Sequence, residues 1–567
     1  ALKMEGASCM VRFPEMVMVC LGDCRPAHGS ADVRKRPARA NGACTIDRMN
    51  HPAVDPADDA RYLALKAHDA RFDGSFFTGV TSTGIYCRPV CRVRVPRREN
   101  CRFFTLAAQA EQAGFRPCLR CRPELAPGPA TWSTHDASGM LARQAARLLD
   151  DPAAWSDATP PMTALAARLG VSDRHLRRIF EAQFGVSPLQ YLQTRRLLTA
   201  KQLLTDTDLP VTRVALASGF GSLRRFNAAF AAHYGLNPTA LRREGRTHEG
   251  QGVTVRLGYR PPYDVDALLA FFARRSIDSV EFSSAGAADA LLGHTLRLRT
   301  GGRSHAGWLT ARFDPDRPAV VLQVSDSLSE VLPLVLAKAR AWLDLDADPA
   351  VIQACLSPET RHEAGAPGGD LAGLRVPGCL DGFELGVRAI LGQQVTVAAA
   401  RTLGQRLVER FGEPLPTPWP ALSRLFPSAE VLAQASGDAL GQLGIVRQRQ
   451  GAIVALAQAV AEQGLTLDAN ADVPATLAAL KTLPGIGDWT AQYMAMRALR
   501  WPDAFPAGDI ALQKALGVDS AREAEQASQA WRPWRSYAVV RAWHRGPTPD
   551  ANENTISIAD YDQPTLG

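Results

Sequence analysis

Two closely spaced cysteine pairs constrain this chain more than any other feature of its sequence. Three residues separate Cys87 from Cys91, and 26 residues later Cys118 and Cys121 follow with two residues between them. Pairs at these spacings can bring four thiolates around one tetrahedral Zn²⁺, and a closed Cys₄ shell leaves no open position for a catalytic water. We therefore predict one Zn²⁺ per chain, and any chemistry at this site must use a sulfur.

Length, composition and charge narrow the class of protein. A chain of 567 residues exceeds what one hydrophobic core serves, so several domains are expected. No apolar run is long enough to span a bilayer, and eleven cysteines are too few for a disulfide scaffold, which predicts a cytosolic protein without a membrane span. Residues 71–125 hold ten Arg against four acidic residues, which favours a polyanion partner over a merely solvated basic surface.

Changes of composition along the chain predict a multidomain, mainly α protein. Met49 is a candidate for the true start, and the leader cysteines have no matching second pair, so we predict no ligand role for them. The expected parts are a poorly structured leader at 1–57, a small zinc-binding α/β domain at 58–126, an all-helical region at 138–246, an α+β subdomain at 253–346, a helical domain at 347–545 and a loose tail at 546–567.

The all-helical region contains one pattern twice. Residues 163–180 and 211–230 each read as two short helices joined at a glycine, with Ser172 capping the second helix of the first copy. Two copies favour a tandem helix-turn-helix over an ordinary small helical bundle. Side chains able to read base edges or touch phosphates on the two recognition helices are Arg174, Arg177, Arg178, Arg224, Arg225 and Asn227.

A glycine-rich segment near the carboxyl end, Leu483-Pro-Gly-Ile-Gly487, predicts a helix-hairpin-helix. Gly485 and Gly487 permit a tight hairpin whose backbone amides can grip a phosphate without sequence preference. A lone carboxylate, Asp509, follows 22 residues after Gly487. The plainer alternative is that Asp509 caps a helix and that Trp489 and Tyr493 are core residues.

The cysteine region resembles the amino-terminal domain of Ada-type DNA alkylation sensors. The matching segments are Thr83-Gly-Ile-Tyr-Cys-Arg-Pro-Val-Cys-Arg92, Arg98-Glu-Asn100 and Gly114-Phe-Arg-Pro-Cys-Leu-Arg-Cys121. The resemblance implies that Cys87 irreversibly accepts a methyl group from a DNA methylphosphotriester. Arg92 and Arg94 are then candidates for holding the phosphate, whereas Cys101 is expected to be a small buried filler. The alternative is a purely structural zinc ribbon, since closed Cys₄ sites are usually structural.

The remaining blocks resemble two further families. The tandem helix-turn-helix is similar to the AraC-type DNA-binding domain. The carboxyl half resembles the AlkA branch of helix-hairpin-helix DNA glycosylases, at the segments Pro261-Pro-Tyr-Asp264, Val376-Pro-Gly-Cys-Leu-Asp-Gly-Phe383, Val387-Arg-Ala-Ile-Leu-Gly-Gln393 and Trp531-Arg-Pro-Trp-Arg-Ser-Tyr537. Cys355 and Cys379 cannot supply the four thiolates of an iron–sulfur cluster.

The glycosylase resemblance implies roles for several residues. Asp509 would stabilise an oxocarbenium-like sugar and help water attack, while Trp489 and Tyr493 would line an electron-rich pocket for a cationic base. Trp489 stands where lyase-type relatives place a nucleophilic Lys, which predicts a monofunctional enzyme. Gln394 stands where a relative inserts a Leu wedge into the duplex.

These observations predict one chain that answers DNA alkylation in two ways. It would be activated as a transcription regulator by methyl transfer to Cys87, and it would excise alkylated purines of the 3-methyladenine class. The expected partners are alkylated double-stranded DNA, promoter operators and RNA polymerase, for a monomer in the bacterial cytosol or nucleoid. The alternative is a transcription regulator whose glycosylase-like half only binds DNA.

Overall fold

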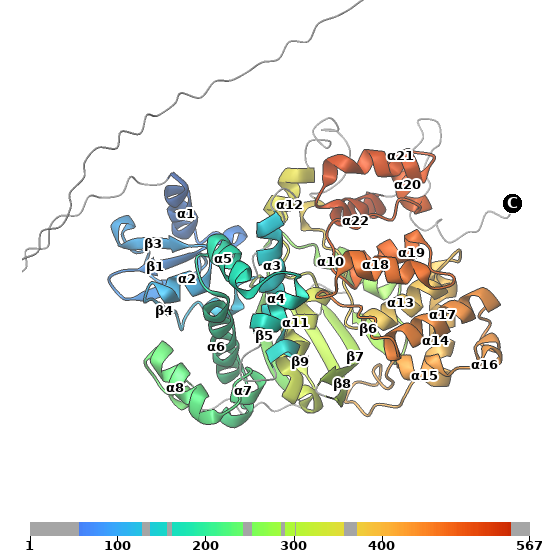
Figure 1. Ribbon diagram of the computed structural model, residues 1–567, viewed down its shortest axis with the longest axis horizontal. Coiled ribbons are helices and arrows are strands. Elements are labelled where there is room, and N and C mark those ends of the chain that lie inside the picture. Colours follow the sequence, from blue (N-terminus) through green and yellow to red (C-terminus); the bar gives the residue numbers. More distant parts are fainter. Residues whose placement is uncertain are drawn as a thin grey trace, which may run out of the picture. The chain divides into compact units, whose positions relative to one another are not determined.

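The computed structural model describes residues 56–127, 137–155, 162–241, 252–284, 290–300, 302–356 and 371–545. The predicted tail lies outside these residues, as does nearly all of the predicted leader, with Met49 and the cysteines Cys9, Cys20, Cys24 and Cys44. Helices dominate the described residues, and two small sheets lie among them (Figure 1). No helix in the described ranges is long and apolar enough to cross a membrane.

The four-cysteine region folds as a small sheet with the strand order β3-β1-β2-β4. Strands β1 and β2 form an antiparallel hairpin, whereas β4 pairs with β2 in parallel. Phe77, Tyr86 and Phe115 fill a core between the sheet and α2. The elements are α1 (Pro56–Lys66), β1 (Phe77–Val80), β2 (Ile85–Cys87), β3 (Cys101–Phe104), α2 (Ala107–Gln112) and β4 (Arg116–Pro117).

Two helix-turn-helix units follow, joined by one long helix. The predicted cap is confirmed, because the Ser172 hydroxyl accepts a hydrogen bond from the His175 amide, and Ser222 does the same for Arg225 in the second unit. The helices are α3 (Ala137–Asp150), α4 (Met162–Arg168), α5 (Asp173–Phe184), α6 (Pro188–Asp206), α7 (Val211–Ala217), α8 (Leu223–Tyr234) and α9 (Pro238–Leu241).

The α+β subdomain is one antiparallel sheet with the strand order β5-β9-β8-β7-β6. Four of its strands correspond to β-rich runs that the sequence predicts at 254–257, 279–282, 295–299 and 319–324. Strand β8 has no such run, because Gly307 and a polar start, Arg303-Ser-His305, interrupt its apolar alternation. The elements are β5 (Val253–Gly258), α10 (Val265–Ala273), β6 (Glu281–Ser284), β7 (Leu291–Thr300), β8 (Arg303–Phe313), β9 (Ala319–Val324), α11 (Leu332–Trp342) and α12 (Pro349–Leu356).

The carboxyl half is helical and packs around two apolar cores. One core lies among α13 to α19, and the other lies among α12 and α19 to α22. The helices are α13 (Gly382–Leu391), α14 (Val397–Phe411), α15 (Ala429–Ala433), α16 (Gly437–Gly441), α17 (Arg447–Ala461), α18 (Val473–Thr482), α19 (Asp488–Arg497), α20 (Ile510–Leu516), α21 (Ala521–Ala527) and α22 (Arg535–Arg545).

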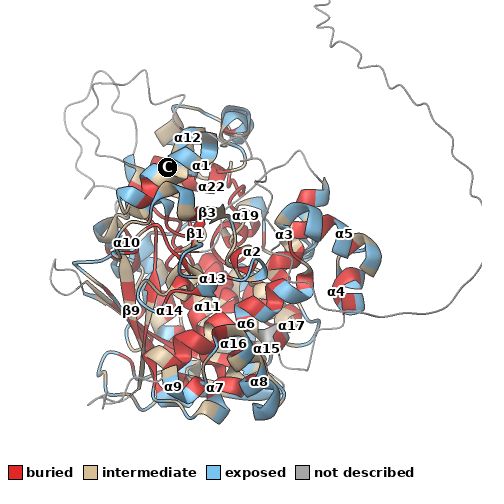
Figure 2. Ribbon diagram, turned by 90° about the vertical axis from the view of Figure 1, so that its left-hand side faces the viewer, coloured by how far each residue is buried: buried red, intermediate tan, exposed pale blue. Residues whose placement is uncertain are grey.

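Helix α6 is buried on most of its faces, and its core continues into the next subdomain. Leu197, Leu203 and Leu204 of α6 belong to the same apolar cluster as Phe226 of α8 and Leu322 of β9. A helix that is apolar on several faces is stabilised by burial on all of them. The second helix-turn-helix unit and the α+β subdomain therefore share one hydrophobic core (buried residues are red in Figure 2).

A buried charged cluster joins the sheet to α13. His294 Nε2 on β7 lies 3.5 Å from Glu384 Oε1 on α13 and 3.7 Å from Glu281 Oε2 on β6. Arg388 pairs with both glutamates. Burial alone would lower the pKa of His294, but Glu384 and Glu281 raise it to about 9.

The raised pKa of His294 predicts that β7 becomes less stable as the pH rises above neutral. The pKa of His294 is raised on folding from 6.5 to about 9, so its contribution is full below pH 6.5 and is lost as the pH rises through 9. We expect the free energy of opening of β7 to fall by roughly 3 kcal/mol across that window. Hydrogen exchange of the β7 amides, corrected for the intrinsic rate at each pH, measures it. His294→Gln should abolish this pH dependence, and an equal slope in both proteins would contradict the assignment.

Candidate functional site

Strand pairing brings the two cysteine pairs together. Because β2 and β4 are parallel neighbours with Tyr86 opposite Pro117, Cys87 at the end of β2 and Cys118 just after β4 lie side by side. With Cys91 and Cys121 in the following turns, the four Sγ atoms all lie within 4.8 Å of one another. Tetrahedral Zn–S bonds of about 2.3 Å place sulfurs about 3.8 Å apart, so the four thiols fit one Zn²⁺.

A buried ion pair braces the second cysteine pair. The Arg88 amide donates to Cys121 Sγ at 3.3 Å, and its side chain donates to the Cys121 carbonyl at 3.0 Å and to Asp73 at 2.8 Å. Arg88 and Asp73 are both buried. Arg88 and Asp73 therefore hold the turn that carries Cys121.

The four sulfurs influence one another strongly. Hydrogen bonding with Cys118 raises the pKa of Cys87, whereas hydrogen bonding with Cys121 lowers that of Cys118. Thiolates this close repel one another, so a dication is needed to keep all four deprotonated at neutral pH. Cys87 itself is 5% exposed.

The other predicted residues of this region lie around the four thiols. Arg92 and Arg94 are exposed on the segment that follows Cys91. Cys101 is buried, donates to the Arg97 carbonyl and stands outside the four-thiol group, as predicted.

The predicted operator-reading side chains are on the outer faces of α5 and α8. Arg177 pairs with Asp173 on its own helix, and Arg178 contacts His175 Nδ1 at 3.1 Å. All six candidates are exposed, namely Arg174, Arg177, Arg178, Arg224, Arg225 and Asn227. They are therefore available to a duplex, and their individual base contacts stay predictions.

Buried charges connect the four-cysteine region to α6. Lys201 of α6 pairs with Glu124 at 2.5 Å, and both side chains are 1% exposed. The same lysine donates to the Cys118 carbonyl at 3.5 Å. Arg122, next to Cys121, pairs with Glu124 and with Asp206 of α6. Sequence reasoning missed this cluster, because nothing in the spacing of these residues pairs them.

The predicted hairpin lies between α18 and α19. Gly485 has a φ of +76°, and a Cβ there would lie 2.9 Å from Ala452 Cβ on α17, so this position requires glycine. Gly487 has a φ of −87° and open space around it. The conformational argument for glycine therefore holds at Gly485 and not at Gly487.

The aspartate and the aromatic residues predicted for the carboxyl half lie together. Trp489 and Tyr493 stack on α19 with ring centroids 5.3 Å apart and an interplanar angle of 13°. Trp489 Nε1 donates to Asp509 Oδ2 at 2.8 Å. Asp509 also caps α20 by accepting from the Leu512 amide at 2.8 Å. Asp509 therefore does cap a helix, and its Oδ2 atom also accepts a hydrogen bond from the indole.

A third aromatic residue was missed by sequence reasoning. Trp543 of α22 donates from Nε1 to Asp509 Oδ1 at 3.3 Å, and its ring lies 6.3 Å from that of Tyr493. No local motif marks Trp543, because only the fold of α22 onto α20 brings it to the aspartate.

Two arginines, Arg497 and Arg275, lie beside Tyr493. Arg497 donates to the Tyr493 hydroxyl at 2.5 Å. Burial would raise the pKa of Tyr493, but Arg497 and Arg275 hold it below its usual value. The hydrogen bond from Arg497 therefore fixes the position of the Tyr493 ring on α19.

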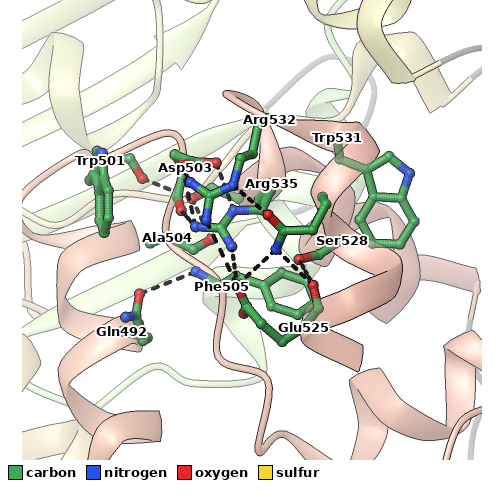
Figure 3. A network of polar contacts seen from close by, with 12 residues as sticks. Gln492, Trp501, Asp503, Ala504, Phe505, Glu525, Ser528, Trp531, Arg532 and Arg535 are labelled. Carbon is green, nitrogen blue, oxygen red and sulfur yellow. Dashed lines mark hydrogen bonds and ion pairs between the residues drawn. The ribbon is translucent and has the colours of Figure 1, made fainter. Parts of the chain in front are cut away.

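The loop before Asp509 is fixed by a polar network centred on the buried residues Asp503 and Arg535. Figure 3 shows Arg532 and Arg535 converging on Asp503, with Glu525 beside Arg535. The Phe505 amide donates to Gln492 of α19 at 3.2 Å. These contacts set the distance between the hairpin helix and the start of α20.

Four known protein families match successive parts of this chain, in the predicted order. Residues 60–124 match the metal binding domain of Ada, and residues 165–244 match a helix-turn-helix domain. Residues 254–381 match the AlkA N-terminal domain, and residues 387–533 match the HhH-GPD superfamily of base excision DNA repair proteins. These matches define a multidomain protein of DNA-binding and DNA-repair modules.

Individual relatives agree with this order. The chain is 39% identical over 495 residues, covering 85% of this chain and 95% of that protein, to the "probable bifunctional transcriptional activator/DNA repair enzyme AlkA" of Mycobacterium tuberculosis. It is 35% identical to DNA-3-methyladenine glycosylase 2 of Escherichia coli, over 52% of this chain and 98% of that protein. The chain belongs to the family of bifunctional Ada/AlkA-type transcriptional activators and DNA repair enzymes.

The four-thiol geometry predicts the metal content of the protein. We expect one zinc per chain in the wild type, and Cys118→Ser should lose most of it because three thiolates bind Zn²⁺ far more weakly than four. Cys101→Ser is the matched control, since it removes a buried thiol outside the group. Elemental analysis of purified protein gives the zinc-to-chain ratio. Full zinc content in Cys118→Ser would contradict the four-ligand site.

Proposed function

We propose that this protein senses alkylated DNA through Cys87, activates transcription in response, and removes alkylated purines from the same DNA. The observation that carries the enzymatic half is the convergence of two indole N–H groups and a helix amide on the carboxylate of Asp509. The proposal is further supported by what the relatives are called, a bifunctional activator and repair enzyme and a 3-methyladenine glycosylase.

For the glycosylase, Asp509 faces the sugar of an extruded nucleotide. As the N-glycosidic bond breaks, its electron pair stays on the base, and the positive charge that develops on the sugar is stabilised by the carboxylate. Water then adds to C1′ and gives up a proton. A purine methylated at N3 or N7 is already cationic, so it leaves as a neutral base with little help from a general acid.

The aromatic residues supply recognition of the base. Trp489 and Tyr493 stack on each other beside Asp509, and Trp543 donates to the other carboxylate oxygen of Asp509. Electron-rich faces attract a positively charged ring. Trp489 occupies the hairpin position where a lyase carries its lysine, so the product is an intact abasic site.

For the sensor, the methyl group moves from phosphate to sulfur. Cys87 Sγ attacks the methyl carbon of a methylphosphotriester, an S–C bond forms, the C–O bond breaks, and its electron pair restores the phosphodiester anion. Cys87, Cys91, Cys118 and Cys121 would hold Zn²⁺, which would keep the Cys87 thiol ionised. Arg92 and Arg94, both exposed, hold the phosphate.

Methylation then changes how the protein meets DNA. Cys87 loses its negative charge on a surface that faces phosphates, so affinity for the duplex rises. The two recognition helices α5 and α8 read the operator, and the protein contacts RNA polymerase as a monomer of the bacterial cytosol or nucleoid.

The catalytic assignment predicts the effect of Asp509→Asn on release of the free base. Loss of the carboxylate charge should slow release of 3-methyladenine from alkylated duplex by at least about a hundredfold, with DNA binding retained. Chromatography of the released base measures it. Asp472→Asn is the matched control, because Asp472 also caps a helix, α18, but lies outside the pocket. If the glycosylase half only binds DNA, neither Asp472→Asn nor Asp509→Asn should release base. Full activity in Asp509→Asn would refute the role assigned to Asp509.

A further inference from the structure

Two consecutive glutamines follow α13, and the structure separates them. Gln394 is exposed, with a left-handed φ of +53° that turns the chain there. Gln393 is half-buried and points the other way, into the hairpin. Its Nε2 donates to the Gly485 carbonyl and to Thr490 Oγ1, both at 2.9 Å.

These two hydrogen bonds join segments that are 92 and 97 residues apart in the chain. One is the loop that carries Gln394 at the predicted wedge position, and the other is the hairpin with the predicted phosphate-gripping amides. Thr490 is 2% exposed, so this bond is shielded from competing water.

Helix α17 contacts both the wedge loop and the hairpin. Arg449 of α17 donates to the Gln393 carbonyl, and Ala452, one turn further along, packs beneath Gly485. The Gln393 side chain and backbone are thus both held. The wedge loop, the hairpin and α17 form one rigid block in which Gln393 is the shared contact.

We propose that Gln393 is a positioning residue for base extrusion. It fixes the wedge loop relative to the hairpin, so that Gln394 is correctly placed to displace the base while the hairpin binds the DNA backbone. This inference rests on the proposed glycosylase function. Gln393 touches neither the base nor the sugar. It acts by holding the adjacent Gln394 in place and by hydrogen bonding to the Gly485 carbonyl of the hairpin.

The test removes the two donated hydrogen bonds and keeps the side-chain length. Gln393→Met should slow single-turnover release of 3-methyladenine at saturating enzyme by about tenfold, the scale of one or two neutral hydrogen bonds. Its dissociation constant for undamaged duplex should stay within about twofold, because phosphate contacts dominate that affinity.

The matched control is Gln450→Met. Gln450 is also a half-buried glutamine whose Nε2 donates to a carbonyl, that of Ile445 at 2.6 Å, but it makes this bond within the α16–α17 segment and not to the hairpin. We expect its release rate to stay within about twofold of the wild type, since only local packing changes.

A second substrate distinguishes positioning from general damage to the site. When the alkylated purine lies in a one-nucleotide bulge, it is unpaired and costs less to extrude. The defect of Gln393→Met should then shrink to within about twofold, whereas Asp509→Asn should stay inactive on both substrates.

The possible outcomes distinguish failure of the positioning role of Gln393 from failure of the proposed glycosylase function. If wild-type protein releases base and Gln393→Met matches it on the paired duplex, the positioning role is wrong. It is also wrong if Gln393→Met is equally slow on the bulge, since the defect would then lie in the pocket. If the wild type releases no base from either substrate, the proposed glycosylase function itself fails.

Discussion

The buried ion pair between Glu124 and Lys201 is the contact on which the arrangement of the amino-terminal half depends. Burying both charges costs several kcal/mol per ion, and that cost is offset only because each group has further partners. Glu124 also pairs with Arg122, and Lys201 also reaches the Cys118 carbonyl. Although burial raises the pKa of Glu124, Lys201 and Arg122 bring it below its usual value, so Glu124 stays ionised at neutral pH.

Helix α6 extends this connection in two directions. It joins the two helix-turn-helix units, and its leucines enter the core of the neighbouring sheet. Through Lys201, α6 contacts the carbonyl of Cys118, one of the four predicted zinc ligands. The same helix separates the two recognition helices, α5 and α8. The two chemistries proposed for the chain use opposite electrostatics: anionic sulfur takes a methyl group from a neutral phosphotriester, whereas aromatic faces and a carboxylate receive a cationic base.

The sequence was most informative where chemistry is local. Ser172 could be recognised as a cap because capping needs only the residues that follow it, and Gly485 because a tight hairpin requires a positive φ. Strand β8 was missed because Gly307 breaks its alternation. Trp543 was missed because its partner, Asp509, lies 34 residues away and is reached only through helix packing. The Cys₄ spacing predicted a metal site, but the parallel pairing of β2 with β4 that assembles it is a non-local contact that spacing cannot specify.

We propose that methylation of one cysteine converts damage in the DNA backbone into operator binding. Full-length protein would be incubated with duplex that carries methylphosphotriesters, and its peptides would be mapped by mass while operator affinity is followed in the same samples. We expect a gain of about 14 Da on the peptide of Cys87 alone, because one methyl replaces one hydrogen, with operator affinity rising in proportion. Methylation of Cys87 without any rise in operator affinity would contradict it.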